Sequence, residues 1–305
     1  MNKYRILAID GGGIRGIISA VILERINKET GFLDKTDMAA GTSTGGLIAL
    51  AIANGINVSA IKDIYLQKGS YIFNDNWFDD LRDLFGLAGA DYNCENLINV
   101  LKEIFGNASL KDLKKHVLVT AFDLDNNSAD EDRRSWQPVY FTNFPFRNLC
   151  GQTGSEDLSD TPVYKAGYYT AAAPTYFPSL DGYIDGGIFA SNPSMEALCM
   201  APYGEPVLFS AGTGISLKHI EGDQLDWGYA QWLKPMAEMM MSGQQLSAHH
   251  QCSELLGKKY FRIAPVFPCD IKIDMDDVDK MDYMLKFAQD VNIDEAVKFV
   301  KEVWL

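Results

Sequence analysis

Hydrophobic and polar positions alternate along the chain in blocks that are typical of an α/β protein. Residues 4–9 form a short apolar run rich in strand formers, which stops at an aspartate and three glycines and predicts a buried strand. Residues 17–29 carry apolar side chains at near-helical spacing and end at Gly31, which predicts a helix. Residues 37–54 repeat the order of strand, glycine loop and helix.

The rest of the chain continues this alternation. Residues 57–113 are expected to be mainly helical, and strands alternating with helices indicate one sheet covered by helices on both faces. An acidic linker at 270–282 precedes an expected C-terminal helix. Further strands are predicted at 117–122, 139–141, 183–185, 206–211 and 259–263, and further helices at 164–169, around the methionines of 236–241 and at 242–255.

Composition and charge narrow the classes of function. The 305 residues are 47% hydrophobic and 22% charged, which excludes an intrinsically disordered chain. The formal net charge of −14 argues against a nucleic-acid-binding face and against electrostatic attraction to anionic lipid. The five cysteines have no paired spacing, so neither a zinc site nor a disulfide framework is expected. Without a visible signal peptide or membrane-spanning run, a cytoplasmic location is expected.

The glycine loop at residues 10–16 is open to three interpretations. Its glycines satisfy G-x-G-x-x-G between a strand and a helix, which is typical of dinucleotide binding, with Asp34 or Asp37 as the ribose acid. The run also resembles the phosphate loop of sugar kinases. Alternatively, its consecutive peptide N–H groups form an oxyanion hole at a helix N-terminus. This loop alone does not decide among these roles or exclude a plain tight turn.

A second glycine loop points to a serine nucleophile. Gly41, Ser43 and Gly45 form G-x-S-x-G between a predicted strand and a predicted helix, as in a nucleophile elbow, where small neighbours let the backbone turn sharply. A serine that merely caps the helix is the alternative. The four histidines (His116, His219, His249 and His250) carry no recognisable motif and are expected to be surface residues.

Asp185 supplies a candidate base at the end of a short apolar strand, before two glycines. An ordinary Asp-Gly turn is the alternative. A free aspartate has a pKa near 3.9, so it accepts a serine proton only if burial raises that pKa.

Taken together, these segments resemble the patatin-like phospholipase family. The family's oxyanion, nucleophile and Asp-Gly-Gly segments match residues 10–16, 41–46 and 185–187. Residues 171–178 look like its segment ending in Pro-x-Tyr-Phe-Pro, and Gly-Thr-Gly at 212–214 closes the pattern.

The resemblance implies a three-layer α/β/α fold with a central, mostly parallel sheet. It implies a catalytic domain over 1–268, with 269–305 as an acidic linker and helix packed on it. By the same resemblance, Ser43 is the nucleophile and Asp185 the base, without a histidine. The oxyanion site comprises Gly11, Gly12, Gly13 and Arg15, and Gly41 and Gly45 form the elbow.

The implied activity is hydrolysis of fatty acyl esters, as by a phospholipase A or lysophospholipase, without metal or organic cofactor. The expected partners are lipid substrate and a membrane or micelle touched through apolar surface, not nucleic acid. Candidates for the acyl pocket are the aromatic residues of 71–92 and the methionines of 236–241, although helical spacing is more typical of core residues. A lid is expected around residues 86–89. A nucleotide-binding kinase or dehydrogenase, a catalytically idle binding protein and a regulated defence effector are the alternatives.

Overall fold

The computed structural model describes residues 2–72, 94–145, 158–202 and 204–305. The segment expected to form a lid lies outside these residues, as does most of the aromatic stretch of 71–92.

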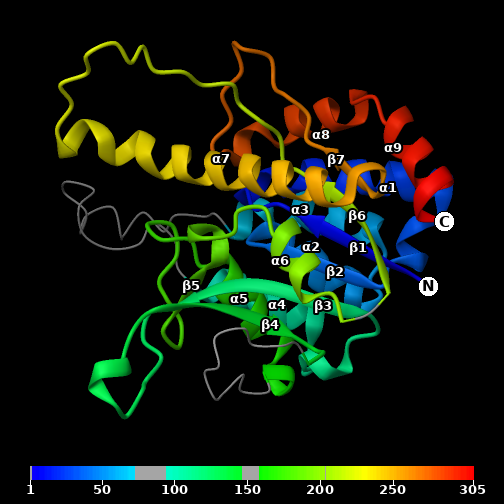
Figure 1. Cartoon of the computed structure of the whole chain (residues 1–305), viewed down its shortest axis with the longest axis horizontal. Coiled ribbons are helices and arrows are strands. Elements are labelled where there is room, and N and C mark those ends of the chain that lie inside the picture. The colour runs from blue at the N-terminus through cyan, green and yellow to red at the C-terminus, as the bar shows by residue number, and fades with distance from the viewer. Residues whose placement is uncertain (1, 73–93, 146–157, 203) are drawn as a thin grey trace.

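The centre of the fold is a mostly parallel sheet (Figure 1). In the described part of the chain its strand order is β4-β3-β2-β1-β6-β7, with β5 paired to β3. Only the pairings of β3 with β4 and with β5 are antiparallel. The strands are β1 (Lys3–Ile9), β2 (Met38–Thr42), β3 (His116–Asp123), β4 (Gln137–Thr142), β5 (Tyr183–Asp185), β6 (Glu205–Ala211) and β7 (Tyr260–Ile263).

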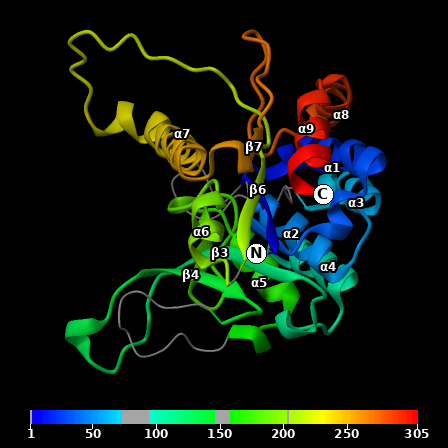
Figure 2. The ribbon, with the colours of Figure 1, turned by 45° about the vertical axis from the view of Figure 1, so that its right-hand side comes forward.

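Helices cover both faces of the sheet, as Figure 2 shows with the sheet nearly edge-on. One face carries α1 (Gly16–Thr30), α2 (Thr44–Asn54), α3 (Val58–Ile72), α4 (Cys94–Phe105), α5 (Val163–Ala171), α8 (Met281–Asp290) and α9 (Asp294–Phe299). The other face carries α6 (Ser194–Met200) and α7 (Tyr229–Leu256). The predicted α/β fold, with helices on both sides of a mostly parallel sheet, is therefore confirmed.

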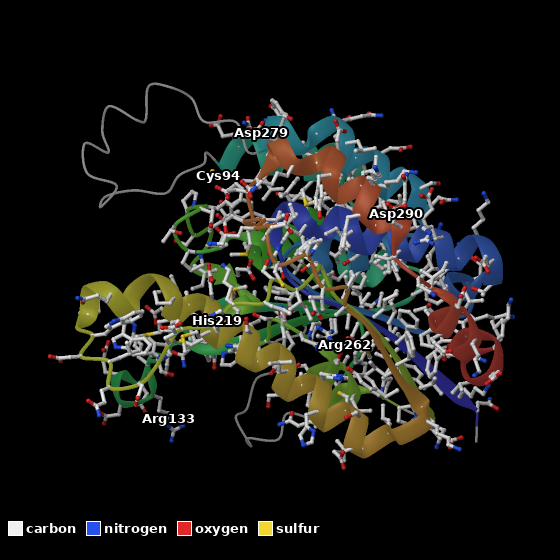
Figure 3. The ribbon with its side chains drawn as sticks, turned by 90° about the horizontal axis from the view of Figure 1, so that it is seen from above. Cys94, Arg133, His219, Arg262, Asp279 and Asp290 are labelled. Atoms are coloured by element: carbon white, nitrogen blue, oxygen red, sulfur yellow. The ribbon has the colours of Figure 1, made fainter. Side chains whose placement is uncertain are left out.

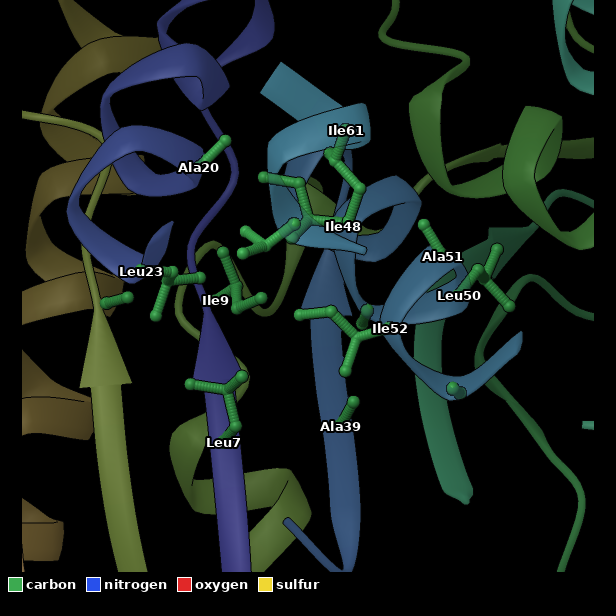
Figure 4. Packing of buried hydrophobic residues seen from close by; sticks show 14 of the residues in the cluster. Leu7, Ile9, Ala20, Leu23, Ala39, Ile48, Leu50, Ala51, Ile52 and Ile61 are labelled. Atoms are coloured by element: carbon green, nitrogen blue, oxygen red, sulfur yellow. The ribbon is translucent and has the colours of Figure 1, made fainter. Parts of the chain in front are cut away.

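Burial on both faces explains why the strands read as continuous apolar runs. Successive side chains of β1 point to opposite faces, so Leu7 and Ile9 join the core under α1 and α2 while Ile6 joins the core under α6 and α7. Figure 4 shows Leu7 and Ile9 of β1 beside Ile48 and Ile52 of α2. These side chains fix the helices against the sheet. The glycine loops that follow β1 and β2 consequently lie at the same end of the sheet.

The C-terminal residues pack on the large helical layer. The sequence predicts one helix there, but the structure has α8, α9 and a π-helical turn at Val300–Trp304. Trp304 is fully buried against Phe32 and Phe209, and Arg25 of α1 donates to the carbonyl oxygens of Ala288 and Val291. These contacts join residues 281–305 to the strands and helices of the N-terminal part.

Two other helices differ from the expectation. The methionine-rich helix and the helix expected at 242–255 form the single 28-residue helix α7, and α6 was not predicted. Despite the length of α7, the described residues include no helix that is both long and apolar enough to span a bilayer.

Candidate active site

Strand β3 brings the two candidate catalytic residues together. Thr42, the last residue of β2, pairs with Thr120 of β3, and Asp185 pairs with the next residue, Ala121. Because β4 occupies the other edge of β3, β5 lies on the same edge as β2, just beyond its end. Ser43 and Asp185, 142 positions apart in sequence, therefore meet at the end of β2.

Ser43 occupies a strained turn between β2 and α2. Its φ of 55° and ψ of −129° lie where residues with a Cβ rarely occur. The turn is tight, because a Cβ on Gly41 would lie 2.1 Å from the carbonyl oxygen of Gly45, and one on Gly45 would lie 2.2 Å from that of Ile9. The Ser43 side chain makes no capping hydrogen bond to α2, so the alternative role of helix cap does not fit.

The Asp185 carboxyl group is buried and faces Ser43. Burial raises its pKa to about 7, although hydrogen bonds from the Ser43 side chain and the Gly187 N–H oppose that rise. The Gly187 N–H donates to Oδ1 of Asp185 at 2.7 Å. Asp185 therefore also forms the Asp-Gly turn that is its alternative role in the sequence. A carboxylate with a pKa near neutrality suits a general base far better than a free aspartate does.

The glycine loop of residues 10–16 is the candidate oxyanion site, and we call it the oxyanion loop. It offers two unbonded peptide N–H groups, whereas the sequence predicts three glycine donors. The Gly11 N–H donates to the carbonyl oxygen of Ser191 (N···O 3.0 Å), and the Ile14 N–H donates to that of Met275 (2.7 Å). Within the described residues, the N–H groups of Gly12 and Gly13 have no hydrogen-bond partner, and both glycines line the cavity that contains Ser43. The candidate donors therefore narrow to Gly12 and Gly13, while Gly11 leaves room for Ser43, whose Cβ would lie 3.3 Å from a Cβ on Gly11.

The Arg15 side chain contacts a backbone carbonyl of this loop. Its Nε donates to the carbonyl oxygen of Gly12 at 3.3 Å. Burial lowers the pKa of the Arg15 guanidinium, and the nearby Asp274 and Glu238 partly offset that effect. Because the C=O of Gly12 and the N–H of Gly13 belong to one trans peptide, holding the carbonyl on one side turns the N–H to the other.

A buried ion pair fixes the start of the loop. Arg262 of β7 binds both carboxylate oxygens of Asp10, at 3.0 Å (Nη1–Oδ1) and 2.5 Å (Nη2–Oδ2), and also donates to Ser210. Burial alone would lower the pKa of Arg262, but attraction to Asp10 outweighs it and raises that pKa. The sequence motifs do not identify Arg262 as a site residue.

A cavity of about 1240 Å³ opens over Ser43 and Asp185. Ser43, Asp185, Gly11, Gly12, Gly13 and Arg15 all line it. From Ser43 it extends between α2, α3 and α4, where its walls are Leu47, Ile48, Ile61, Leu97, Leu101 and Phe105. Met239, Met240 and Met241 of α7 line it as well, in keeping with one of the two expected sources of an acyl pocket.

The other residues singled out in the sequence lie elsewhere. All four histidines are in the described part of the chain, and none lines the cavity. Asp37 precedes β2 at the opposite end of the strand from the glycine loop and pairs with Arg5, so it is not placed as a ribose acid. Among the described residues, no three His, Cys, Asp or Glu side chains gather into a potential metal site.

The pKa of Asp185 predicts the pH dependence of any reaction that uses it as a base. Below about pH 7 the carboxyl group is protonated and cannot accept the Ser43 proton, so kcat/KM for a soluble ester should rise through a single ionisation near pH 7. A pH profile between 4.5 and 9 measures this. A rise centred near pH 4 would contradict the assignment of Asp185 as a buried base.

The buried ion pair predicts a large loss of stability when its cation is removed. Arg262→Met leaves the buried Asp10 carboxyl group without its cationic partner and should lower the free energy of unfolding by roughly 3–5 kcal/mol. Arg133→Met is the control, because Arg133 is exposed at the periphery in Figure 3 and should cost well under about 1 kcal/mol. Urea unfolding of both variants tests this, and equal small losses would contradict it.

Comparisons with known proteins place the chain in a family. The family model described as patatin-like phospholipase matches residues 7–198. The cGAMP-activated phospholipase of Pseudomonas aeruginosa is 27% identical, over 85% of this chain and 78% of that protein. The probable inactive patatin-3-Kuras 1 of Solanum tuberosum is 30% identical, over 77% of this chain and 70% of that protein.

Among solved structures, VipD from Legionella pneumophila is similar, with a TM-score of 0.39 and 12% identity over 93% of this chain and 67% of that one. The family model covers more than half of the chain, including both glycine loops and Asp185. The chain therefore belongs to the patatin-like phospholipase family.

Proposed function

We propose that this protein is a serine hydrolase of fatty acyl esters, acting as a phospholipase A or lysophospholipase through a Ser43–Asp185 dyad. The observation that carries the proposal is that a serine on a strained turn and a buried aspartate with a pKa of about 7 line the same cavity. Membership of the patatin-like phospholipase family supports lipid esters as the substrate class.

In the proposed mechanism, Ser43 Oγ attacks the ester carbonyl carbon while Asp185 accepts the hydroxyl proton. The N–H groups of Gly12 and Gly13 stabilise the tetrahedral oxyanion, and a donor of this kind is worth roughly 3–4 kcal/mol. The alcohol leaves with the proton from Asp185, which forms an acyl-enzyme. Water then attacks the acyl carbon, Asp185 takes its proton, and the fatty acid leaves as Ser43 recovers its hydroxyl hydrogen.

The aliphatic part of the cavity is the proposed acyl-chain site. Its walls at α2, α3 and α4 carry Leu, Ile, Val and Phe side chains, and a fatty acyl chain gains roughly 0.8 kcal/mol for each CH₂ group that leaves water. Each of these helices faces the core elsewhere along its length. The chain would therefore lie inside the large helical layer, with its ester end at Ser43.

Removal of either dyad residue should abolish turnover without unfolding the protein. Ser43→Ala and Asp185→Asn are each expected to lower kcat on a soluble short-chain ester by roughly a thousand-fold or more. A fluorophosphonate probe should label the wild-type protein and not Ser43→Ala. Ser247→Ala, on the exposed part of α7, is the control and should keep full labelling. Undiminished turnover or labelling in Ser43→Ala would overturn the proposed function.

We further propose that the mouth of the cavity binds a lipid surface through apolar contacts. Five large side chains that line the cavity are also between 45% and 66% exposed: Ile188, Leu217, Met239, Met240 and Leu246. They come from α7, the segment after β5 and the segment after β6, so they surround the opening. The net charge of −14 makes an electrostatic anchor to anionic lipid implausible, whereas apolar insertion does not need one.

Two leucines of α7 give a matched test of this surface. Leu246 lines the cavity and is 62% exposed, whereas Leu255 is 63% exposed and lies away from it. In a Ser43→Ala background, Leu246→Gln should weaken binding to phosphatidylcholine vesicles roughly five- to ten-fold, and Leu255→Gln should leave it unchanged. Cosedimentation measures both, with and without anionic lipid. Equal binding by the two variants would contradict the proposed surface.

A further inference from the structure

Residues far along the chain hold the oxyanion loop in place. The catalytic significance of this arrangement rests on the proposed function. The two unbonded N–H groups belong to consecutive peptides, one joining Gly11 to Gly12 and the next joining Gly12 to Gly13. In a trans peptide the C=O and N–H point in opposite directions, so whatever holds the carbonyl also aims the N–H. The partners of these carbonyls, and of the peptide that follows, therefore determine where the oxyanion donors point.

Thr213 holds the first of these peptides. Its hydroxyl donates to the carbonyl oxygen of Gly11 with an Oγ1···O distance of 2.8 Å, and the residue is 2% exposed. A Cβ added to Gly12 would lie 2.2 Å from Oγ1 of Thr213, so the hydroxyl packs directly against the loop. Thr213 lies just after β6, between Gly212 and Gly214. The dyad mechanism gives this Gly-Thr-Gly segment no role.

Met275 holds the peptide on the other side. Its carbonyl oxygen accepts the Ile14 N–H at 2.7 Å, and a Cβ on Gly13 would lie 2.1 Å from the same oxygen. Gly13 has a φ of +58°, a conformation that favours glycine. The Met275 carbonyl therefore packs against Gly13 and closes the loop at the end opposite Thr213.

Side chains tie the Met275 segment into a fixed turn. Oδ2 of Asp277 accepts the Asp274 N–H at 2.8 Å and the Lys280 ammonium at 2.7 Å. Lys280 also donates to the carbonyl oxygen of Lys272 at 2.6 Å. The turn thus has its own hydrogen bonds and then continues into α8, which packs on α1. We call residues 272–280 the strap.

We propose that the C-terminal third of the chain aims the oxyanion donors, with Thr213 and Met275 as positioning residues for the N–H groups of Gly12 and Gly13. Both lie after residue 198, where the match to the family model ends. Neither residue is proposed to touch the reacting atoms. Thr213 acts through the Gly11 carbonyl, and Met275 acts through the Ile14 N–H and the backbone of Gly13.

A pair of substitutions separates this role from simple packing. Thr213→Val keeps the shape but loses the hydroxyl, so the Gly11 peptide can rotate and kcat should fall roughly 10- to 100-fold, with KM within about two-fold. Thr213→Ser keeps the hydrogen bond and should retain most of the wild-type kcat. A trifluoromethyl ketone, which forms a tetrahedral adduct with Ser43, should bind Thr213→Val more weakly by the same factor as kcat/KM falls. An unreactive ether analogue of the ester should bind both variants equally.

The strap is tested through Asp277, with a nearby aspartate as the control. Asp277→Ala removes the acceptor for Asp274 and Lys280, so hydrogen exchange of the Ile14 amide should accelerate at least ten-fold and kcat should fall several-fold. Asp279 is exposed, has no hydrogen bond or ion pair among the described residues and lies at the edge of the molecule in Figure 3. Asp279→Ala should therefore leave both the exchange rate and kcat unchanged.

The possible outcomes separate this inference from the proposed function. If the wild-type protein showed no Ser43-dependent turnover, the proposed function would be overturned, and the strap would have no catalytic significance. Wild-type turnover with a normal kcat in Thr213→Val would overturn the positioning role of Thr213 alone. An Ile14 amide that exchanges freely in the wild-type protein would overturn the role of Met275, whatever the activity.

Discussion

The left-handed backbone of Ser43 is the constraint on which the rest of the site depends. A residue with a side chain at φ 55° is unfavourable by roughly 1–3 kcal/mol unless its surroundings hold it there. Here the surroundings are the end of β2, the start of α2 and the Thr170 hydroxyl, which accepts the Ser43 N–H at 2.8 Å. The glycines at 11, 41 and 45 follow from the same turn, since a Cβ at any of them would crowd the backbone or Ser43. The glycine motifs therefore describe how closely three chain segments approach one another.

Two buried aspartates at the same edge of the sheet have opposite environments. Asp10 follows β1 and is paired with Arg262, which satisfies its charge with two hydrogen bonds. Asp185 ends β5, accepts the Gly187 N–H and faces Ser43, and no cation among the described residues lowers its pKa. Burial raises the pKa of both carboxyl groups, but Arg262 opposes that rise at Asp10, whereas at Asp185 burial raises the pKa to about 7. One carboxylate is thereby suited to a structural role and the other to proton transfer, as in other sites where environment separates two acids.

The sequence predicts the fold class and leads to Ser43 and Asp185, which line one cavity, because both predictions depend on local patterns. Short apolar runs that end in glycine loops identify the strand ends, and in a mostly parallel sheet most of these ends meet at one edge. Arg262 could not be found in this way, since it follows Tyr260 and Phe261 in a strand whose pattern shows no partner 252 positions away. The cavity-lining residues of α2 and α4 could not be predicted, because periodicity marks an apolar face without saying whether core or cavity lies against it.

The hydrogen bonds of each peptide in the glycine loop, rather than the number of glycines, set the number of candidate oxyanion donors. Four successive N–H groups run from Gly11 to Ile14, and the outer two are already bonded to Ser191 and Met275. Those two bonds fix the ends of the loop, so the inner pair can stay unbonded without the loop collapsing onto a different partner. The inner pair lines the cavity beside Ser43 and, in the proposed mechanism, binds the developing oxyanion. The bonded neighbours that hold the ends of the loop are therefore as much a part of the proposed site as the inner donors.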